Sequence, residues 1–450
     1  MPHNPVPFDF VPFSHESPLT GKKEEWENAG GTPISGRIDY TLNVKTPLHI
    51  VGDQPKNQQK EIVMSSFLRR HGRPLIPGAS LKGMLRAFVE ALTNSWVSQA
   101  TDNHPAVYKK QTNTFTAFSP PEANTYGPVI PERLHPKFEG NEIDLATFLF
   151  GAVAEGKGEA YPSRLIFEDI TIPDTSLDRN LISLPDVPGD AFMGGPKPRI
   201  NNWWYFKPRS IKRKVYERHI NTDFMGSQYR GRKFYYHQKP EHVLAWYANP
   251  KSWPQPQPLR SYPVETVKAE TTLSGKIYFN ALSPKFLDMV LLSLNSETLA
   301  HKLGYGQAFG LGSVKIRIDQ LAMNNDSGFD LDEEYFNLKA GNWNNYHNYI
   351  DANALSWLRR ILHFDEKFIA EKTNIFTYPA FSTEFRKLVS WDEATAAAMS
   401  AGAKIIGSEI ELSSKQARDV AVALLNQKKT IDFRLYQEKS CLWDEIIKRG

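Results

Sequence analysis

Residues 74–92 read PLIPGASLKGMLRAFVEAL, and the apolar pattern of the chain changes its period within this stretch. The pair Pro77-Gly78 is typical of a segment that leads into a helix. Lys82 and Arg86 are four residues apart and therefore share one face of that helix. A different face is apolar and consists of Leu81, Met84, Leu85, Phe88, Val89 and Leu92. The stretch predicts a helix with one buried side that begins near Ser80.

The segments around this helix alternate between apolar and polar residues, which is typical of strands with one buried face. Residues 37–45 alternate before the helix, and residues 164–172 and 267–279 are two further strand candidates behind it. A second apolar helix is predicted over residues 284–294, and a last strand over 314–319. The order is β-α-β-β-α-β, so we predict an α+β fold with a ferredoxin-like core, the layout that RNA-recognition domains also use. Many unrelated proteins share this layout, so it does not by itself indicate a function.

The predicted core covers residues 35–322 and is interrupted by two insertions, residues 95–162 and 173–265. Both are too long to be simple turns, so we expect them to be structured. Residues 1–34 are rich in Pro, Phe and Gly and are predicted to form an N-terminal arm without regular structure. Residues 323–450 are predicted to form a mostly helical C-terminal extension. Its candidate helices cover residues 351–364 and 413–427.

Composition excludes several classes of protein. Cys441 is the single cysteine of the 450 residues, which rules out an internal disulfide and a cysteine-based zinc site. The chain starts without a signal-peptide pattern and has no apolar run near the roughly 18 residues that a membrane helix needs. We therefore expect a soluble protein of the prokaryotic cytoplasm with no membrane partner. The net charge of +4 is too small to indicate a partner, so the distribution of charge matters more.

Positive charge gathers in the second insertion. Between Lys197 and Lys233 the chain has eleven Lys or Arg residues and two acidic ones, a net charge of +9. Aromatic residues such as Trp203 and Trp204 are interleaved with these cations. Single-strand binders use cations to follow phosphates and aromatic rings to stack on bases, and we select the run Lys212, Arg213 and Lys214 as candidate RNA contacts. The alternative is a core that buries the aromatic residues and leaves the cations in solvent.

Three motifs on this scaffold are similar to one known family. The first is residues 74–86, PLIPGASLKGMLR; the second is SRLIFED at residues 163–169, preceded by FLFG at 148–151; the third is LGYGQAFGLGSV at residues 303–314. With these motifs in this order, the chain resembles the RAMP superfamily of CRISPR-associated proteins, and among them the backbone subunits of type III effector complexes. The resemblance covers roughly residues 36–320, apart from the insertions.

The resemblance implies a guide-RNA-binding backbone subunit that positions guide and target RNA for antiviral defence, together with other CRISPR-associated subunits. A helix N-terminus has unpaired N–H groups that suit a phosphate, so Ser80, Lys82 and Arg86 are candidate contacts. In the alternative reading, Ser80 is only an N-cap and the two cations form a solvated face. The third motif would let the RNA backbone approach closely at four glycines, Gly304, Gly306, Gly310 and Gly312. A turn beside a bulge is the alternative there. In the family, an insertion placed like residues 173–265 commonly forms a thumb that separates the paired strands.

Catalysis is an open alternative. In catalytic family members, an acidic residue between the first strand and the first helix supports metal-dependent cleavage of target RNA. Here residues 51–73 contain Asp53 and Glu61. Asp53 follows the strand end and is the candidate catalytic and metal-binding residue, with Mg²⁺ or Mn²⁺ as the ion and no tightly bound cofactor expected otherwise. The family's Asp usually lies nearer the helix, where this chain has Met64-Ser65-Ser66, and an Asp after Gly is also a common turn residue.

Two other functions are considered. Guide-RNA processing by His71 through general acid–base chemistry is disfavoured, because His71-Gly72 is typical of a turn. The second is an adaptor that contacts only other proteins and neither binds RNA nor catalyses a reaction. It would show no salt-dependent affinity for RNA.

Overall fold

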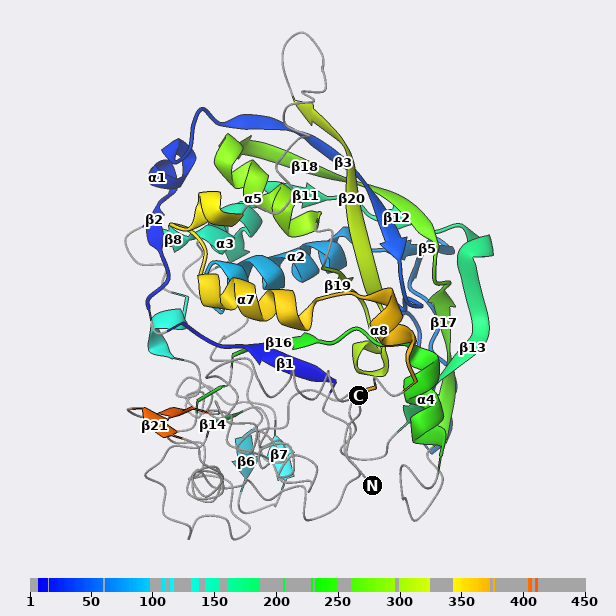
Figure 1. Ribbon diagram of the computed structural model, residues 1–450. Coiled ribbons are helices and arrows are strands. Elements are labelled where there is room, and N and C mark those ends of the chain that lie inside the picture. The colour runs from blue at the N-terminus through cyan, green and yellow to red at the C-terminus, as the bar shows by residue number, and fades with distance from the viewer. Residues whose placement is uncertain are drawn as a thin grey trace.

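A five-stranded antiparallel sheet forms the framework of the fold, and helices α2 (Gly78–Leu92) and α5 (Pro284–Leu294) lie on one side of it (Figure 1). Its strands follow the order β11 (Leu165–Phe167), β18 (Thr272–Leu282), β3 (Ile34–Val44), β20 (Ser313–Met323) and β19 (His301–Lys302). In chain order the first four core strands are β3, β11, β18 and β20, so the first strand lies between the third and the fourth. This is the strand order of a ferredoxin-like unit. The predicted α+β class is confirmed.

The structure is a computed structural model. It describes residues 7–14, 16–59, 61–97, 107–109, 114–116, 131–136, 142–153, 160–186, 205–206, 228–229, 231–249, 260–295, 299–323, 343–372, 375–376, 404–406 and 409–411. No helix within these residues is both long and apolar enough to cross a bilayer.

Helices α2 and α5 bury their apolar stripes against this sheet. Phe88 of α2 and Phe286 of α5 are fully buried, and burying such a side chain stabilises the fold by about 1.5–3 kcal/mol. Tyr40 of β3 faces Gly275 of β18, where any Cβ would lie 2.4 Å from the tyrosine ring. The glycine therefore makes room for the ring, and the predicted alternation of buried residues along β3 is confirmed.

The second insertion is closed at its base by a two-stranded ribbon. Strand β13 (Leu177–Asp186) pairs antiparallel with β17 (Arg260–Val267), and α4 (Pro240–Ala248) packs beside them. Their apolar side chains form a second core together with Phe309 and Leu311, which precede β20. The predicted third strand, residues 267–279, is confirmed from Thr272 onward as β18, but its predicted start at Val267 is wrong. A turn at residues 268–271 separates β17 from β18, and Glu270 adopts a φ of +60° in it.

The N-terminal residues are more ordered than the sequence predicts. Strand β1 (Phe8–Val11) pairs with β16 (Arg232–Tyr235), and β2 (Thr20–Lys22) pairs with β8 (Glu142–Asp144). A short helix α1 (Lys23–Asn28) follows, and its Trp26 packs on Phe148 and Phe286. The prediction of an arm without regular structure is therefore wrong for this segment. Each strand pairs with a segment more than a hundred residues away, which no local pattern signals.

Helix α7 (Ala352–Ile361) confirms the first predicted helix of the C-terminal extension and packs against α2 (Figure 1). Asp351 caps it by accepting from the Ala354 amide, and the Asp351 amide donates to the Leu92 carbonyl at the end of α2. The candidate helix over residues 413–427 lies outside the described residues. The remaining elements are α3 (Leu145–Phe150), α8 (Glu366–Ala370), β4 (Arg69–Arg70), β5 (Arg73–Ile76), β12 (Ile170–Thr171), β6 (Val107–Lys109), β7 (Thr114–Thr116), β9 (Ala152–Val153), β10 (Ala160–Tyr161), β14 (Tyr205–Phe206), β15 (Gln228–Tyr229), β21 (Lys404–Ile406) and β22 (Glu409–Glu411).

Candidate nucleic-acid interface

The mouth of helix α2, residues 77–80, already holds a carboxylate. The helix begins at Gly78, whose amide donates to Asp169 Oδ1 at 2.8 Å. Asp169 Oδ2 accepts from Arg70 Nη1 at 2.5 Å, so one side chain bridges a guanidinium and the helix N-terminus. Pro77 is the N-cap residue and Ser80 lies three residues further on, with its amide bonded to the Pro77 carbonyl. The reading of Ser80 as an N-cap is therefore wrong, and Asp169 satisfies the first amide instead.

The two cations of α2 have different surroundings. Arg86 is half-buried; its Nε donates to Glu90 at 2.7 Å and its Nη1 to the Gly151 carbonyl at 2.7 Å. The Arg86 side chain therefore connects α2 with Gly151, the residue that follows α3. Lys82 is also half-buried, and burial together with the charge of Arg86 lowers its pKa. No ion pair or hydrogen bond of the Lys82 side chain is present among the described residues, so it is the cation of this helix that remains available. A contact of Ser80, Lys82 or Arg86 with RNA stays a prediction.

The glycine loop, residues 303–313, owes its glycines to its own packing. Gly304, Gly306, Gly310 and Gly312 have φ values of +80°, +76°, +93° and +74°, which favour glycine. A Cβ on Gly304 would lie 2.2 Å from the His49 carbonyl oxygen, and one on Gly312 1.9 Å from the Leu303 carbonyl oxygen. The space beside these two residues is filled by protein backbone. These contacts and φ values give the glycines an internal reason, and a contact of the four glycines with RNA stays a prediction. Gly304, Tyr305 and Gln307 are partly exposed.

A ladder of backbone hydrogen bonds connects the glycine loop with the helix mouth. The Tyr305 amide donates to the His49 carbonyl at 2.8 Å, the Leu68 amide to the Ile50 carbonyl at 2.9 Å, and the Leu75 amide to the Leu68 carbonyl at 3.1 Å. Leu75 lies two residues before Pro77. Three strand-to-strand steps amount to about 14 Å, so both features lie in one layer with the intervening segment between them.

That intervening segment, residues 50–59 and 61–68, forms an antiparallel hairpin with isolated bridges at Val51–Phe67 and Lys56–Ile62 and no regular strands. Its arms are joined by the Gly52 amide bonded to the Ser66 carbonyl and the Val63 amide bonded to the Pro55 carbonyl, both at 2.9 Å. The Asn57 side chain closes the turn by accepting from the amides of Gln59 and Glu61. The described residues of this hairpin therefore lie between the helix mouth and the glycine loop.

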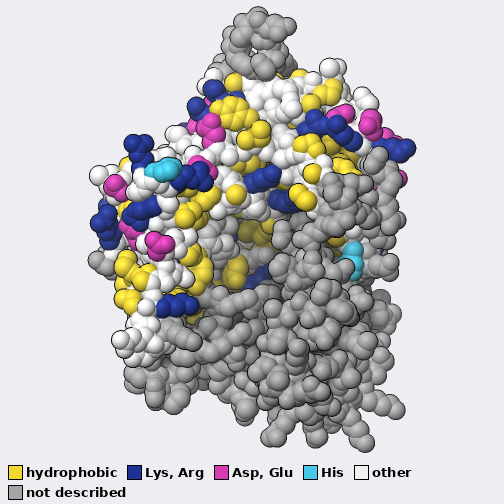
Figure 2. Space-filling model, turned by 180° about the vertical axis from the view of Figure 1, so that it is seen from behind, with side chains coloured by type: hydrophobic (Ala, Val, Ile, Leu, Met, Phe, Trp, Pro, Cys, Tyr) yellow, Lys and Arg dark blue, Asp and Glu magenta, His cyan; other side chains and the backbone are white. Residues whose placement is uncertain are grey.

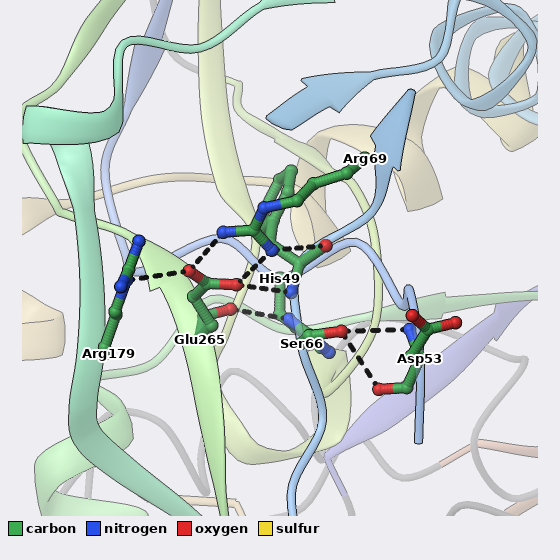
Figure 3. A network of polar contacts seen from close by, with 7 residues as sticks. His49, Asp53, Ser66, Arg69, Arg179 and Glu265 are labelled. Atoms are coloured by element: carbon green, nitrogen blue, oxygen red, sulfur yellow. Dashed lines mark hydrogen bonds and ion pairs between the residues drawn. The ribbon is translucent and has the colours of Figure 1, made fainter. Parts of the chain in front are cut away.

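Glu265 of β17 fixes the base of this hairpin (Figure 3). Its carboxylate accepts from both Arg69 Nη atoms, at 2.7 and 2.6 Å, and from the Phe67 amide at 2.8 Å. Arg179 Nε approaches from β13 at 3.4 Å, on the other side of the carboxylate from Arg69. Burial alone would raise the pKa of Glu265, but the hydrogen bonds from Arg69 and Phe67 outweigh it and hold the pKa below its usual value. Hairpin, β13 and β17 therefore share one ionic junction.

His49 is a buried structural histidine at the same junction. Its Nδ1 donates to the Glu265 carbonyl at 2.7 Å, so its Nε2 accepts from the Ser65 hydroxyl at 2.8 Å. Burial lowers the pKa of His49 and keeps the ring neutral. Both His49 and Ser65 are fully buried, so this serine–histidine pair has no access to a substrate. It holds the hairpin to β17.

Asp53 lies on the first arm of the hairpin with its backbone fixed and its carboxylate exposed. Its amide donates to Ser66 Oγ at 3.0 Å, and the Ser66 hydroxyl donates back to the Asp53 carbonyl at 3.1 Å. Figure 3 shows the carboxylate directed away from the Glu265 junction, with no contact drawn to it. The described residues contain no group of three His, Cys, Asp or Glu that could hold a metal ion. One carboxylate with water and RNA phosphate oxygens still matches the way Mg²⁺ binds at nucleotide sites, so Asp53 could contribute a single ligand.

The most basic part of the second insertion, with Lys212, Arg213 and Lys214, lies outside the described residues. The last two cations of the +9 stretch, Arg232 and Lys233, are described, and both are half-buried in β16. Arg232 donates to the Ser95 carbonyl, and Lys233 Nζ lies 4.1 Å from the centre of the Phe8 ring. Burial lowers the pKa of Lys233 to about 7. These two cations pack within the protein, which neither reading predicts, and a contact of Lys212, Arg213 and Lys214 with RNA stays a prediction.

The described surface carries no single field of positive charge on the face seen in Figure 2. Lysine and arginine side chains alternate there with acidic and hydrophobic ones around a hollow. Arg70, 63% exposed, is paired with Asp169, whereas Arg73 is exposed and has no described partner. Sequence reasoning missed Asp169, Glu265 and Arg69 as organisers of the site. Asp169 ends the SRLIFED motif, which was the available signal; Glu265 has none, because its role depends on pairing across the fold.

The fold and this arrangement define a ferredoxin-like α+β protein with a glycine loop and a helix mouth in one layer. A family model described as the RAMP superfamily matches residues 41–315, more than half of the chain, and the chain belongs to that superfamily. Among solved structures, a chain of a "Type IV-B CRISPR Complex" is 16% identical; the match covers 65% of this chain and 92% of that chain, with a TM-score of 0.28. A likeness this partial identifies no function. A comparison with curated proteins gave no match.

Proposed function

We propose that this chain is a guide-RNA-binding backbone subunit of a CRISPR effector ribonucleoprotein of type III. It would position guide and target RNA for antiviral defence, together with other CRISPR-associated subunits. Membership of the RAMP superfamily supports the class. The observation that carries the proposal is the backbone ladder from Tyr305 through His49 and Leu68 to Leu75, which puts the two family motifs on a common layer.

The chemistry of this layer suits a polyanion of any sequence. Lys82 is held half-buried without a described partner, and Arg73 is exposed on β5, which leads into α2. A partly desolvated cation attracts a phosphate more strongly than one in bulk water. Contacts to phosphate fix position without reading bases, and base pairing with the guide reads the target. The interface is therefore expected to tolerate any guide sequence.

Co-purification with RNA and salt-dependent binding test this proposal. Lys82→Glu should weaken binding of single-stranded RNA by about tenfold and reduce the salt dependence, because a phosphate contact is lost and repulsion is added. Lys23→Glu makes the same change of charge at an exposed position of α1, which Figure 1 shows far from β5. Equal effects of both variants, or no salt-dependent affinity in the purified complex, would favour an adaptor that contacts only proteins.

Metal-dependent cleavage of target RNA is the second candidate. It is favoured by the exposed carboxylate of Asp53, which has no partner among the described residues and stands on a backbone fixed by Ser66. Bound Mg²⁺ or Mn²⁺ would stabilise the charge that develops on the scissile phosphate. The complex, loaded with guide, should then cut complementary RNA, and Asp53→Asn should abolish one product without affecting assembly. Asp174→Asn, an exposed acid outside the hairpin, is the control. Identical product patterns for the wild type and Asp53→Asn would exclude this role.

A further inference from the structure

Lys302 of β19 is a buried lysine directed into the glycine loop. The residue is 8% exposed, and its Nζ donates to the Leu311 carbonyl at 3.0 Å and to the Gly310 carbonyl at 3.3 Å. It therefore contacts the loop from inside the protein, on the side away from solvent. Buried ammonium groups are normally paired with a carboxylate, because burying a lone charge is costly. No such carboxylate pairs with Lys302 among the described residues.

Two other side chains hold the same stretch of the loop. The Thr46 hydroxyl donates to the Gly310 carbonyl at 2.7 Å and accepts from the Ser313 amide at 2.9 Å. Gln238 Nε2 donates to the Ala308 carbonyl at 3.0 Å. Together with Lys302 they satisfy the carbonyls that point inward. The exposed side of the loop, at Tyr305 and Gln307, therefore has its shape set by donors beneath it.

We propose that Lys302 is a positioning residue for RNA, which fixes the outward shape of the glycine loop by holding the carbonyls of Gly310 and Leu311. This inference rests on the proposed RNA-binding function and adds a residue that does not itself touch the ligand. The lysine also brings a positive charge to the inner side of the loop, where little solvent screens it. A phosphate on the outer side would be attracted by that charge.

The charge of Lys302 is expected to change near neutral pH. Burial lowers its pKa to about 7. The charge of Lys302 acts on His237, and burial together with that charge lowers the pKa of His237 well below its usual value. His301, the preceding residue of β19, bonds the Ser293 carbonyl instead, and burial lowers its pKa to about 4. The His301 ring is therefore neutral from pH 6 upward, and burial favours the neutral form of His237 as well. Between pH 6 and pH 8.5 Lys302 is the member of this group that loses a proton, so RNA affinity should fall over that range.

Lys302→Met tests the proposal against Lys276→Met as the matched control. Both variants remove one positive charge, but Lys276 lies exposed on β18. RNA affinity of the complete complex is measured from pH 6 to pH 8.5 by titration with a single-stranded RNA of fixed sequence. Lys302→Met should lose about tenfold in affinity at pH 6 and should lose the pH dependence, whereas Lys276→Met should keep it. A folded Lys302→Met with wild-type affinity and pH profile overturns the inference.

Two additional variants separate the possible failures. Gln307→Glu puts a negative charge on the outer side of the loop and should weaken RNA binding if the loop lies at the RNA. If it does so while folded Lys302→Met binds as the wild type, the proposed function stands and the role of Lys302 fails. If neither variant changes the affinity, the loop is not part of the RNA site. Should Lys302→Met fail to fold, Thr46→Val removes the other donor to Gly310, and wild-type affinity of that folded variant overturns the inference.

Discussion

The mouth of helix α2 and the glycine loop lie in one layer, but their polar groups are satisfied in opposite ways. At the helix mouth, charged side chains neutralise each other on the surface: Asp169 receives both the Gly78 amide and Arg70. In the glycine loop, the polar groups are backbone carbonyls held from beneath by Lys302 and Thr46. A ligand at the mouth must compete with a carboxylate, whereas a ligand on the loop meets a surface whose shape is already fixed. The difference indicates that the glycine loop is more rigid than the helix mouth.

The largest effect should come from Gly312→Ala, which adds a Cβ in the glycine loop. A Cβ would lie 1.9 Å from the Leu303 carbonyl oxygen at a φ of +74°. We expect the free energy of unfolding to fall by about 3 kcal/mol or more, measured by urea denaturation. Gly83→Ala in α2 has no atom within 4 Å of the new Cβ and should instead stabilise by about 0.5–1 kcal/mol. Similar small changes for both variants would mean that the loop adapts easily.

Glu265→Gln should have the next largest effect, because this carboxylate fixes the base of the hairpin that lies between the helix mouth and the glycine loop. Loss of the charge leaves the Arg69 guanidinium without its partner, and we expect a loss of about 2–3 kcal/mol. The pKa of Glu265 lies below its usual value in the folded protein. Its contribution is therefore present above about pH 4.5 and lost as pH falls through the lower, folded value. Unfolding of the variant should depend less on pH in that acidic window; an unchanged acid profile would count against the junction.

Lys302→Met should change the alkaline side of the stability profile. The folded pKa of about 7 lies below the ordinary 10.5, so the unfolded state binds more protons between these values. Stability of the wild type therefore rises with pH in this window, by about 1 kcal/mol from pH 7 to pH 8 for this residue. Lys233 shares the same low pKa and should keep its own contribution in the variant. Denaturant titrations at several pH values measure the slope, and an undiminished slope in Lys302→Met would show that Lys302 stays charged.

Sequence patterns predict those parts of the fold whose contacts are local. The apolar stripes of α2 and α5 and the alternation along β3 follow from neighbours a few residues apart, and the elements form where they are expected. Local sequence patterns do not predict strands β1 and β2, because their partner strands lie more than a hundred residues away.

The candidate site follows the same rule. The glycines of the loop are recognisable by type, but the reason for them is the carbonyl of Leu303 or His49, which periodicity does not reveal. The pairing of Glu265 with Arg69 joins residues 196 positions apart and has no local signal. Asp169 stands in a recognisable motif, yet only the fold shows that it reaches the Gly78 amide.

Asp169→Asn should have the smallest effect on stability. It tests whether a phosphate competes with this carboxylate at the helix mouth. The amide side chain can still accept from the Gly78 amide but no longer offsets Arg70 or the positive end of the helix, so stability should fall by about 0.5–1 kcal/mol in thermal unfolding. If the carboxylate competes with a phosphate for the helix mouth, RNA affinity should rise in this variant although stability falls. Arg70→Gln removes the other partner of the same pair and should lower affinity. Parallel losses of affinity in both variants would instead identify Asp169 as a structural cap that the RNA never displaces.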